Sequence, residues 1–269
     1  MDALELTLKT EHVVALSDAY YKKSHREFED VSTQRKLLAD ALGSSLQEIQ
    51  TRFGRAIDWL SVGCGAGELD TPLLESHAGT IRRYTGIDPN HIHLESFKIP
   101  TATASRTNLV HSTFEAWGPD NQYDVVSAIH VIYYTNDAEG FVKKILQTLR
   151  KGGRAIIAIA PLSPMNRLAK AFWAEQGTYP IFSEQLTPLL EKLGVRYSQC
   201  NVEAMIPLAH YITDTKNQAI IDFTVQAATT SLSPEGQELL QSAFTAAAVE
   251  VDGQKMLQHP VDYFVIERK

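Results

Sequence analysis

Hydrophobic positions near the N-terminus recur at helical spacing. Leu38, Ala41 and Leu42 follow one another at intervals of one, three or four residues, which is typical of a helix with one apolar face. We therefore expect helices over residues 1–53, with a stop at Gly43 before a new serine-capped helix.

After residue 53, short apolar runs rich in β-branched residues alternate with helical stretches. The predicted strands are Ile57–Val62, Arg82–Ile87, Asn108–His111, Tyr123–His130, Arg154–Ala160, Val195–Ala204 and Val261–Glu267. The predicted helices are Glu68–His77, Asn90–Phe97, Asp137–Leu149, Ser183–Leu193, Thr213–Ala228 and Pro234–Ala248. This alternation predicts an α/β fold with a parallel, doubly wound sheet, whose ligands bind at the carboxyl ends of the strands.

A glycine-rich turn follows the first predicted strand, and an acid ends the second. Gly63, Gly65 and Gly67 have the spacing GxGxG, because Glu68 occupies the third glycine position of a dinucleotide fingerprint. Asp88 lies 21 residues after Gly67. Glycines let a ligand approach the backbone, and a carboxylate at this place can bind a ribose diol. The pattern resembles the S-adenosylmethionine (SAM) site of class I methyltransferases.

This resemblance implies a Rossmann-like fold with a seven-stranded, mostly parallel sheet and an antiparallel last strand. SAM is the expected cofactor and S-adenosylhomocysteine (SAH) the product. We interpret residues 1–53 as a helical substrate lid and 54–206 as the SAM-binding core. Residues 207–260 are then a helical insertion that completes the substrate pocket, and 261–269 the final strand.

Further cofactor contacts are expected beside the glycines and the acid. Thr113 and Phe114 follow the third strand, where this class places a polar group and an apolar surface against adenine; Phe114 could equally be a core residue. His93 and Ile129, near the ends of the second and fourth strands, complete the predicted set.

Neither a cysteine nucleophile nor a metal site is expected. Cys64 is interpreted as a small residue that fills the glycine turn, since no base lies near it in sequence. His91 and His93 have no third ligand, and no cluster of acids of the kind used by metal-dependent methyltransferases is found.

Composition limits which kinds of partner and which cell compartment are expected. The net charge of −7 and the absence of a basic run disfavour a nucleic-acid substrate. The two cysteines, Cys64 and Cys200, lie far apart in sequence, which favours a reducing cytoplasm. There is no signal-peptide pattern, and no run approaches the roughly 18 apolar residues of a membrane span.

The end of the fourth predicted strand reads AIHVIYY, from Ala128 to Tyr134. Methyltransferases acting on nucleic-acid bases or protein glutamine amides carry an Asn/Asp-Pro-Pro-aromatic tetrad here. This chain lacks that tetrad, which disfavours both substrate classes.

The chain resembles histamine N-methyltransferases over nearly its whole length. The resemblance is carried by LSVGCGAGELD (Leu60–Asp70), HVIYYTND (His130–Asp137), the segment Tyr20–Leu37 and the segment His259–Lys269. It implies a monomeric enzyme with a SAM domain and a small helical substrate region, which methylates an imidazole ring nitrogen of a small amine.

Several substrate-side positions depart from that family. Gln34 stands where the family has a glutamate, His130 where it has a glutamine, and His259 where it has an asparagine. Since charge-assisted hydrogen bonds are the stronger kind, loss of the carboxylate weakens the case for a cationic substrate. The other replacements are His25 at an aromatic position and Met165 and Ala169 at tryptophan positions, whereas Tyr21 and Phe28 persist.

We therefore predict an N-methyltransferase of a small imidazole- or amine-containing molecule, histamine- or histidine-like. The predicted catalytic residues are His130, Gln34 and Tyr134. The predicted substrate-binding residues are Tyr21, His25, Phe28, Tyr133, Met165 and His259. The alternatives are a small-molecule O-methyltransferase with a histidine base and a SAM-binding protein without catalysis. A protein substrate is disfavoured because the lid segments would enclose the pocket.

Overall fold

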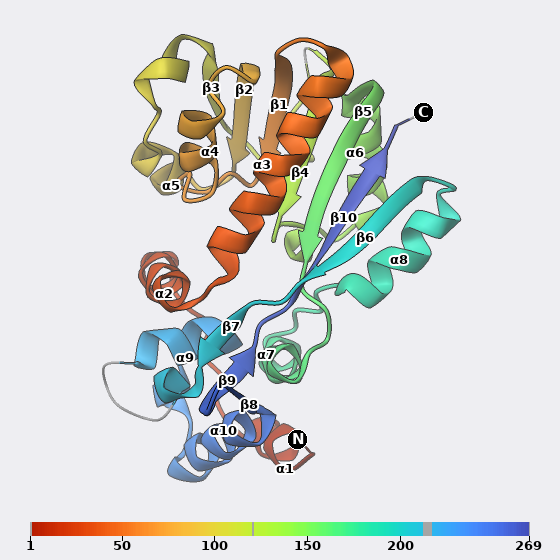
Figure 1. Ribbon diagram of the computed structural model, residues 1–269. Coiled ribbons are helices and arrows are strands. Elements are labelled where there is room, and N and C mark those ends of the chain that lie inside the picture. The colour runs from red at the N-terminus through yellow and green to blue at the C-terminus, as the bar shows by residue number, and fades with distance from the viewer. Residues whose placement is uncertain (1, 120, 212–216, 269) are drawn as a thin grey trace. The chain divides into compact units, whose positions relative to one another are not determined.

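The computed structural model describes residues 2–119, 121–211 and 217–268, which form two compact units (Figure 1). The sheet unit comprises Lys36–Ile159, Ser183–Asn201 and Asp262–Lys269. The helical unit comprises Met1–Arg35, Ala160–Phe182 and Val202–Val261.

A seven-stranded sheet organises the sheet unit, in the order β3-β2-β1-β4-β5-β10-β6. The strands are β1 (Ile57–Val62), β2 (Ile81–Asp88), β3 (Thr107–His111), β4 (Tyr123–Ile129), β5 (Leu149–Ile159), β6 (Arg196–Val202) and β10 (Val261–Glu267). β1 pairs in parallel with β2 and β4, whereas β10 pairs antiparallel with β5. This confirms the predicted Rossmann-like methyltransferase fold, including the antiparallel last strand.

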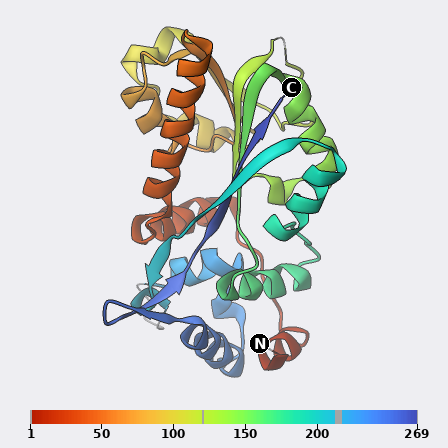
Figure 2. The ribbon, with the colours of Figure 1, turned by 45° about the vertical axis from the view of Figure 1, so that its right-hand side comes forward.

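Helices cover both faces of this sheet (Figure 2). One face carries α3 (Gln34–Phe53), α4 (Asp70–Ser76) and α5 (His91–Ser96), and the other carries α6 (Ala138–Thr148) and α8 (Ser183–Lys192). β1 is buried along its whole length, as expected for a strand covered on both faces. A 3₁₀ helix over Thr101–Arg106 precedes β3, and another over Ile132–Tyr134 follows β4.

The predicted helix stop at Gly43 is wrong, because α3 runs through it. A Cβ atom at Gly43 would lie 3.0 Å from Cε1 of His77 and 3.2 Å from Cδ2 of Leu73. The glycine therefore permits close approach of α3 to the C-terminal end of α4. Burial of Leu42 and Leu46 on α3 outweighs the cost of about 1 kcal/mol for a glycine inside a helix.

In its described residues, the helical unit packs five helices and a small sheet around its own apolar core. The helices are α1 (Asp2–Leu8), α2 (Asp18–Val31), α7 (Pro164–Glu175), α9 (Gln218–Val225) and α10 (Pro234–Ala247). The sheet has the order β7-β9-β8, formed by Met205–Pro207, Gln254–Gln258 and Val249–Val251, all antiparallel. Short 3₁₀ helices occupy Leu208–Tyr211 and Thr229–Ser231.

The sequence did not predict α7 or the small sheet. Met165, Leu168 and Phe172 of α7 are buried in the core of the helical unit, so the segment after β5 belongs to this unit rather than to the 54–206 core. Most of α3 belongs to the sheet unit, not to a lid over 1–53. The predicted helix start at Thr213 lies outside the described residues.

The described residues contain neither a membrane-spanning helix nor a metal-binding cluster. No helix among them is both long and apolar enough to cross a membrane. Within the same residues, no group of three or more His, Cys, Asp or Glu side chains could hold a metal ion.

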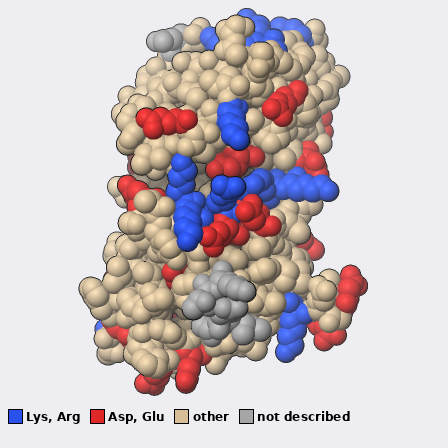
Figure 3. All heavy atoms as spheres, turned by 90° about the vertical axis from the view of Figure 1, so that its left-hand side faces the viewer, with Lys and Arg blue, Asp and Glu red and all other residues tan. Residues whose placement is uncertain are grey.

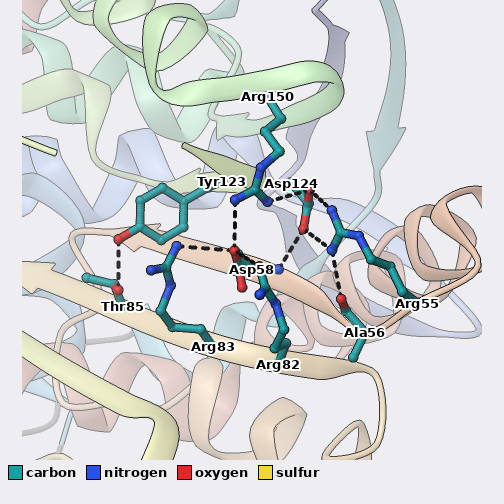
Figure 4. A network of polar contacts seen from close by, with 9 residues as sticks. All are labelled: Arg55, Ala56, Asp58, Arg82, Arg83, Thr85, Tyr123, Asp124 and Arg150. Carbon is teal, nitrogen blue, oxygen red and sulfur yellow. Dashed lines mark hydrogen bonds and ion pairs between the residues drawn. The ribbon is translucent and has the colours of Figure 1, made fainter. Parts of the chain in front are cut away.

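An arginine–aspartate network lies near the amino ends of β1 and β4 (Figure 4). Arg55 binds both carboxylate oxygens of buried Asp124 at 2.9 Å, and Arg150 adds a third bond at 2.9 Å. The neighbouring carboxylate of Asp58 accepts bonds from Arg82, Arg83 and Arg150. On the face shown in Figure 3, a group of Lys and Arg side chains lies at the uppermost end of the view.

Replacement of Asp124 should reveal the contribution of this network to stability. Burial acts to raise the pKa of Asp124, but bonds from Arg55, the Asp58 N–H and Arg150 outweigh burial and lower it. We expect Asp124→Asn to lose roughly 2–3 kcal/mol of unfolding free energy at pH 7, less than the ~3–5 of a fully buried pair. The reduction is expected because Arg55, whose side chain is 41% exposed, can turn to water.

The pH dependence provides the check. Because the folded-state pKa is lowered, the stabilisation is present above the unfolded-state pKa of about 3.9 and is lost as the pH falls through the folded value. Chemical denaturation at a series of pH values from 7 to 3 should therefore show a difference in unfolding free energy between wild type and Asp124→Asn that becomes smaller toward pH 3. Asp252→Asn, on an exposed turn, is the control; a gap independent of pH would contradict the assignment.

Candidate functional site

The carboxyl ends of the central strands meet at one edge of the sheet. Val62 of β1 pairs with Ile87 of β2 and with Ala128 of β4. Gly63 and Asp88 therefore leave the sheet at the same edge. The strand order reverses between β1 and β4, and ligands of open α/β sheets bind at such a switch point.

The glycine turn is held against neighbouring elements by close contacts. Gly63 and Gly67 have φ angles of 67° and 80°, a region that favours glycine. A Cβ atom at Gly63 would lie 2.4 Å from Cγ2 of Val131, and one at Gly67 would lie 2.8 Å from the ring of Phe97. These two glycines are thus required by the packing of the turn against the segment after β4 and against the end of α5.

Gly65 and Asp88 form the part of the turn that fits a cofactor. Gly65 has a φ of 56° and, at its Cβ position, only a carboxylate oxygen of Glu68 at 3.4 Å. Its N–H donates to Oδ2 of Asp88 at 2.9 Å, and the N–H of Asn90 donates to Oδ1 at 2.8 Å. A carboxylate oxygen accepts more than one hydrogen bond, so this oriented acid can also accept from a ribose diol. Nδ1 of His93 lies 3.7 Å from Oδ1 of Asp88.

The residues after β3 have mixed roles. The hydroxyl of exposed Thr113 accepts from the N–H of Ala116 at 3.2 Å and shapes the turn. Phe114 is buried, with its ring centroid 5.2 Å from that of Phe141 and the Lys144 ammonium 5.1 Å from its centroid. Phe114 is thus a core side chain, one of the two alternatives that the sequence left open; an adenine contact for Thr113 stays a prediction.

A buried acid and thiol lie beneath the glycine turn. The hydroxyl of fully buried Tyr84 donates to Oδ2 of Asp70 at 2.6 Å. Burial raises the pKa of Asp70 to about 6, against the lowering effect of bonds from Tyr84 and Ser61. Burial, together with the charges of Asp70 and Asp88, raises the pKa of the Cys64 thiol far above its usual range. A protonated, buried thiol agrees with the interpretation of Cys64 as turn filler.

At the end of β4, His130 has a left-handed backbone with a φ of 55°. β4 ends one residue earlier than predicted, at partly buried Ile129. The His130 N–H donates to the carbonyl of Ala158 at 2.9 Å, and Nδ1 lies 3.1 Å from the Tyr133 hydroxyl. The two rings are stacked within 13°. Tyr134 is 64% exposed.

In the helical unit, three predicted substrate residues share one face of α2. Tyr21 and His25 are stacked, with ring centroids 6.0 Å apart. Phe223 of α9 meets Tyr21, His25 and Phe28 at centroid distances of 5.5, 5.0 and 4.8 Å. The sequence analysis missed Phe223; its position on an apolar helix next to a charged Asp222 was the available signal.

The buried pair Gln34–His259 lies beside these rings. Phe28 meets the His259 ring edge to face at 4.8 Å. The amide nitrogen of Gln34, which is 2% exposed, lies 2.8 Å from Nδ1 of His259 and donates to the carbonyl of His259 at 3.2 Å. A carbonyl oxygen can only accept, so the Gln34 atom in both contacts is the amide nitrogen, a donor. Nδ1 of His259 is therefore assigned as an acceptor, and the ring proton is assigned to Nε2.

The predicted residues therefore fall into two sets. Gln34, Tyr21, His25, Phe28 and His259 come together in the helical unit, and His130, Tyr133 and Tyr134 come together in the sheet unit. Met165 and Phe28 are both buried among the apolar side chains of the helical unit, and the sulfur of Met165 lies 3.8 Å from the Tyr211 hydroxyl; a substrate contact for either stays a prediction.

Known proteins match the chain over two different extents, about half of it or nearly all of it. Ubiquinone biosynthesis O-methyltransferase of Rickettsia conorii is 30% identical over 49% of this chain and 47% of its own length. The chain thus spans about half the length of such O-methyltransferases. Histamine N-methyltransferase of Bos taurus is 22% identical over 92% of this chain and 95% of its own length.

Solved structures share the fold. The plantazolicin methyltransferase BpumL in complex with SAH has a TM-score of 0.59 at 13% identity, covering 99% of this chain and 95% of that chain. The family model "Methyltransferase domain" matches residues 32–199, a range that contains the glycine turn, Asp88 and His130. With more than half of its length matched, the chain belongs to the methyltransferase domain family, of the class I type that depends on S-adenosylmethionine.

Proposed function

We propose that this enzyme transfers a methyl group to a nitrogen of a small imidazole- or amine-containing molecule. The observation that carries the proposal is the cluster in the helical unit. Tyr21, His25, Phe28 and Phe223 present aromatic rings beside the neutral pair Gln34–His259. Rings of this kind bind a flat heterocycle, and an amide–imidazole pair supplies hydrogen bonds without a buried charge.

The turn and acid of the sheet unit are the proposed cofactor site. Gly65 and Asp88 would hold SAM, with Gly63 and Gly67 keeping the turn closed against its neighbours. SAM, when bound, supplies an electrophilic methyl group on a sulfonium. The chain's own residues then have to bind, orient and desolvate the acceptor.

A neutral acceptor nitrogen needs no strong base. An imidazole has a free lone pair at neutral pH, since its pKa is about 6.5. Orientation is then the main contribution, and ideal alignment gives effective molarities of about 10⁵–10⁸ M. We assign to His130 or Gln34 the hydrogen bond from the far ring N–H, which turns the near lone pair toward the methyl. Tyr133 and Tyr134 form pocket wall, where π faces favour the cation that develops on the ring.

Glu29 is one of the carboxylates near the cluster, with Oε1 3.9 Å from Nε2 of His25. Its other oxygen accepts from Nε of Arg35 at 2.8 Å. Because Arg35 already neutralises this carboxylate, a cationic substrate would gain little from it.

A small-molecule O-methyltransferase is the second candidate. The matches to ubiquinone biosynthesis O-methyltransferases favour it, and His130, bonded to the Tyr133 hydroxyl, would be the general base. Those matches cover half of the chain, whereas the match to histamine N-methyltransferase spans 92% of it. The coverage favours the nitrogen acceptor.

An acceptor panel tests the proposal. Purified enzyme with SAM should release SAH with histamine, histidine or related imidazoles, with N-methylated product identified by mass spectrometry. Turnover with phenols alone, rising steeply through the histidine pKa of about 6.5, would establish the O-methyl alternative. If the protein binds SAM but releases no SAH with imidazoles, amines or phenols, the result would support a SAM-binding protein without catalysis.

His130→Asn should separate acceptor orientation from cofactor binding. Asparagine tolerates the left-handed backbone that alanine would strain, so the segment after β4 is expected to keep its path. We expect kcat to fall about 10²-fold or more, the range for loss of a positioned catalytic group, while the Kd for SAM changes less than a few-fold. His12→Asn, at an exposed position, is the control. Equal losses in turnover and SAM affinity would sink the assigned role.

Gln34→Met tests the buried pair. Methionine has a similar volume but leaves the His259 carbonyl without its donor, at a cost of about 1–3 kcal/mol for an unsatisfied buried group. We expect lower stability and a raised KM for the acceptor, with an unchanged Kd for SAM. Gln47→Met, on an exposed position of the same helix, should alter none of these; an unchanged acceptor KM in Gln34→Met would remove Gln34 from the substrate site.

A further inference from the structure

Asp70 is a buried carboxylate without a cationic partner. Its side chain is 3% exposed, and among the described residues no Lys, Arg or His forms an ion pair with it. Its partners are hydroxyl groups: that of Tyr84, at 2.6 Å, and that of Ser61. A buried charge is costly unless it is paired, so the ionised form of this acid is poorly stabilised by the protein alone.

The acid is packed directly under the glycine turn. A Cβ atom at Gly86 would lie 2.8 Å from both the Cys64 sulfur and the Tyr84 hydroxyl oxygen, so these side chains converge over β2. The Asp70 carboxylate lies at the same place, since it accepts from Tyr84. Together with burial, its charge raises the pKa of the Cys64 thiol in the turn.

The polar groups that act on Asp70, or on which its charge acts, come from two strands and the turn. β1 contributes Ser61, β2 contributes Tyr84, and the turn contributes Cys64 and Glu68. Burial raises the pKa of Asp70 to about 6; the bonds from Tyr84 and Ser61 oppose this, and the charge of Glu68 adds to it. A modest positive charge brought to the turn would therefore change its protonation near neutral pH.

We propose that Asp70 is a positioning residue that senses the charge on the cofactor, giving up its proton to solvent when the sulfonium of SAM binds and retaining it when the neutral thioether of SAH binds. The inference rests on the proposed function of the glycine turn as a SAM site. SAM carries one positive charge more than SAH, and Coulomb attraction is strong in a site shielded from water. No covalent bond changes: the proton leaves the carboxyl group for bulk water.

This linkage favours the donor over the product. Between pH 5 and pH 7 the protonated fraction of Asp70 falls. The affinity for SAM therefore rises relative to the affinity for SAH as the pH rises. If the sulfonium lowers the pKa of the acid by one unit, the ratio of SAM to SAH affinity rises about fivefold between pH 5 and pH 7, and about tenfold over the whole titration. After methyl transfer, the acid takes back a proton and the product is held less tightly.

Calorimetry counts the protons directly. Binding of SAM and of SAH to the full chain is titrated at pH 6 in buffers of different ionisation enthalpy. We expect wild type to release up to about half a proton more with SAM than with SAH, and Asp70→Asn to abolish this difference and flatten the pH profile of the affinity ratio. Histidines at the same edge, such as His93, remain in both proteins and cancel in the comparison.

Two further variants keep the test decisive. Tyr84→Phe removes a bond that stabilises the charged acid, so the extra proton release should move to higher pH even if Asp70→Asn does not fold. Asp262→Asn, at a buried carboxylate bonded to Asn201, should retain the wild-type difference. Equal proton release with SAM and SAH in wild type, or an unchanged difference in Asp70→Asn, overturns the inference and leaves the cofactor site standing. Binding of neither ligand overturns both.

Discussion

The close packing of the glycine turn against the segment after β4 is the constraint on which the cofactor edge depends. The N–H groups of Gly63 and Cys64 both donate to the carbonyl of Ile87, and Val131 occupies the space that a Cβ atom at Gly63 would need. The turn is thereby fixed between β2 and β4. Because of this fixation, Asp88 and His130 emerge at defined places beside it, and we propose that the first meets the cofactor and the second the acceptor.

The cofactor half could be predicted because it is determined locally. β1 and β10 have the predicted bounds, since each is a mostly apolar run with a clear limit: Gly63 follows β1, and Pro260 precedes β10. The GxGxG turn and Asp88 are also local, as each follows such a run. Gly43 shows the limit of local inference: its role is set by His77 and Leu73, which lie about thirty residues away, and tertiary packing overrides helix propensity there.

The substrate half is assembled from distant segments, and the sequence alone could not assemble it. Gln34 and His259 are 225 residues apart and share two hydrogen bonds. The family resemblance had placed both in the pocket, but their mutual contact, the role of Phe223 and the burial of Met165 depend on how α2, α7 and α9 pack. α7 did have local signals that the prediction did not use, namely the N-cap Ser163, Pro164 in its first turn and one buried apolar face; what local pattern could not show is that this face packs in a second core.

Buried aspartates lie at both the amino edge and the carboxyl edge of the sheet, but they are held by different kinds of group. At the amino edge, Asp58 and Asp124 are each neutralised by arginines, which is what a purely structural buried acid requires. At the carboxyl edge, Asp70 and Asp88 are held by hydroxyl and N–H groups instead. The negative charge of a carboxylate that is held only by neutral donors is not neutralised by the protein. A cationic ligand can then supply the missing charge, which is the arrangement expected of a site that binds a sulfonium donor and releases a neutral product.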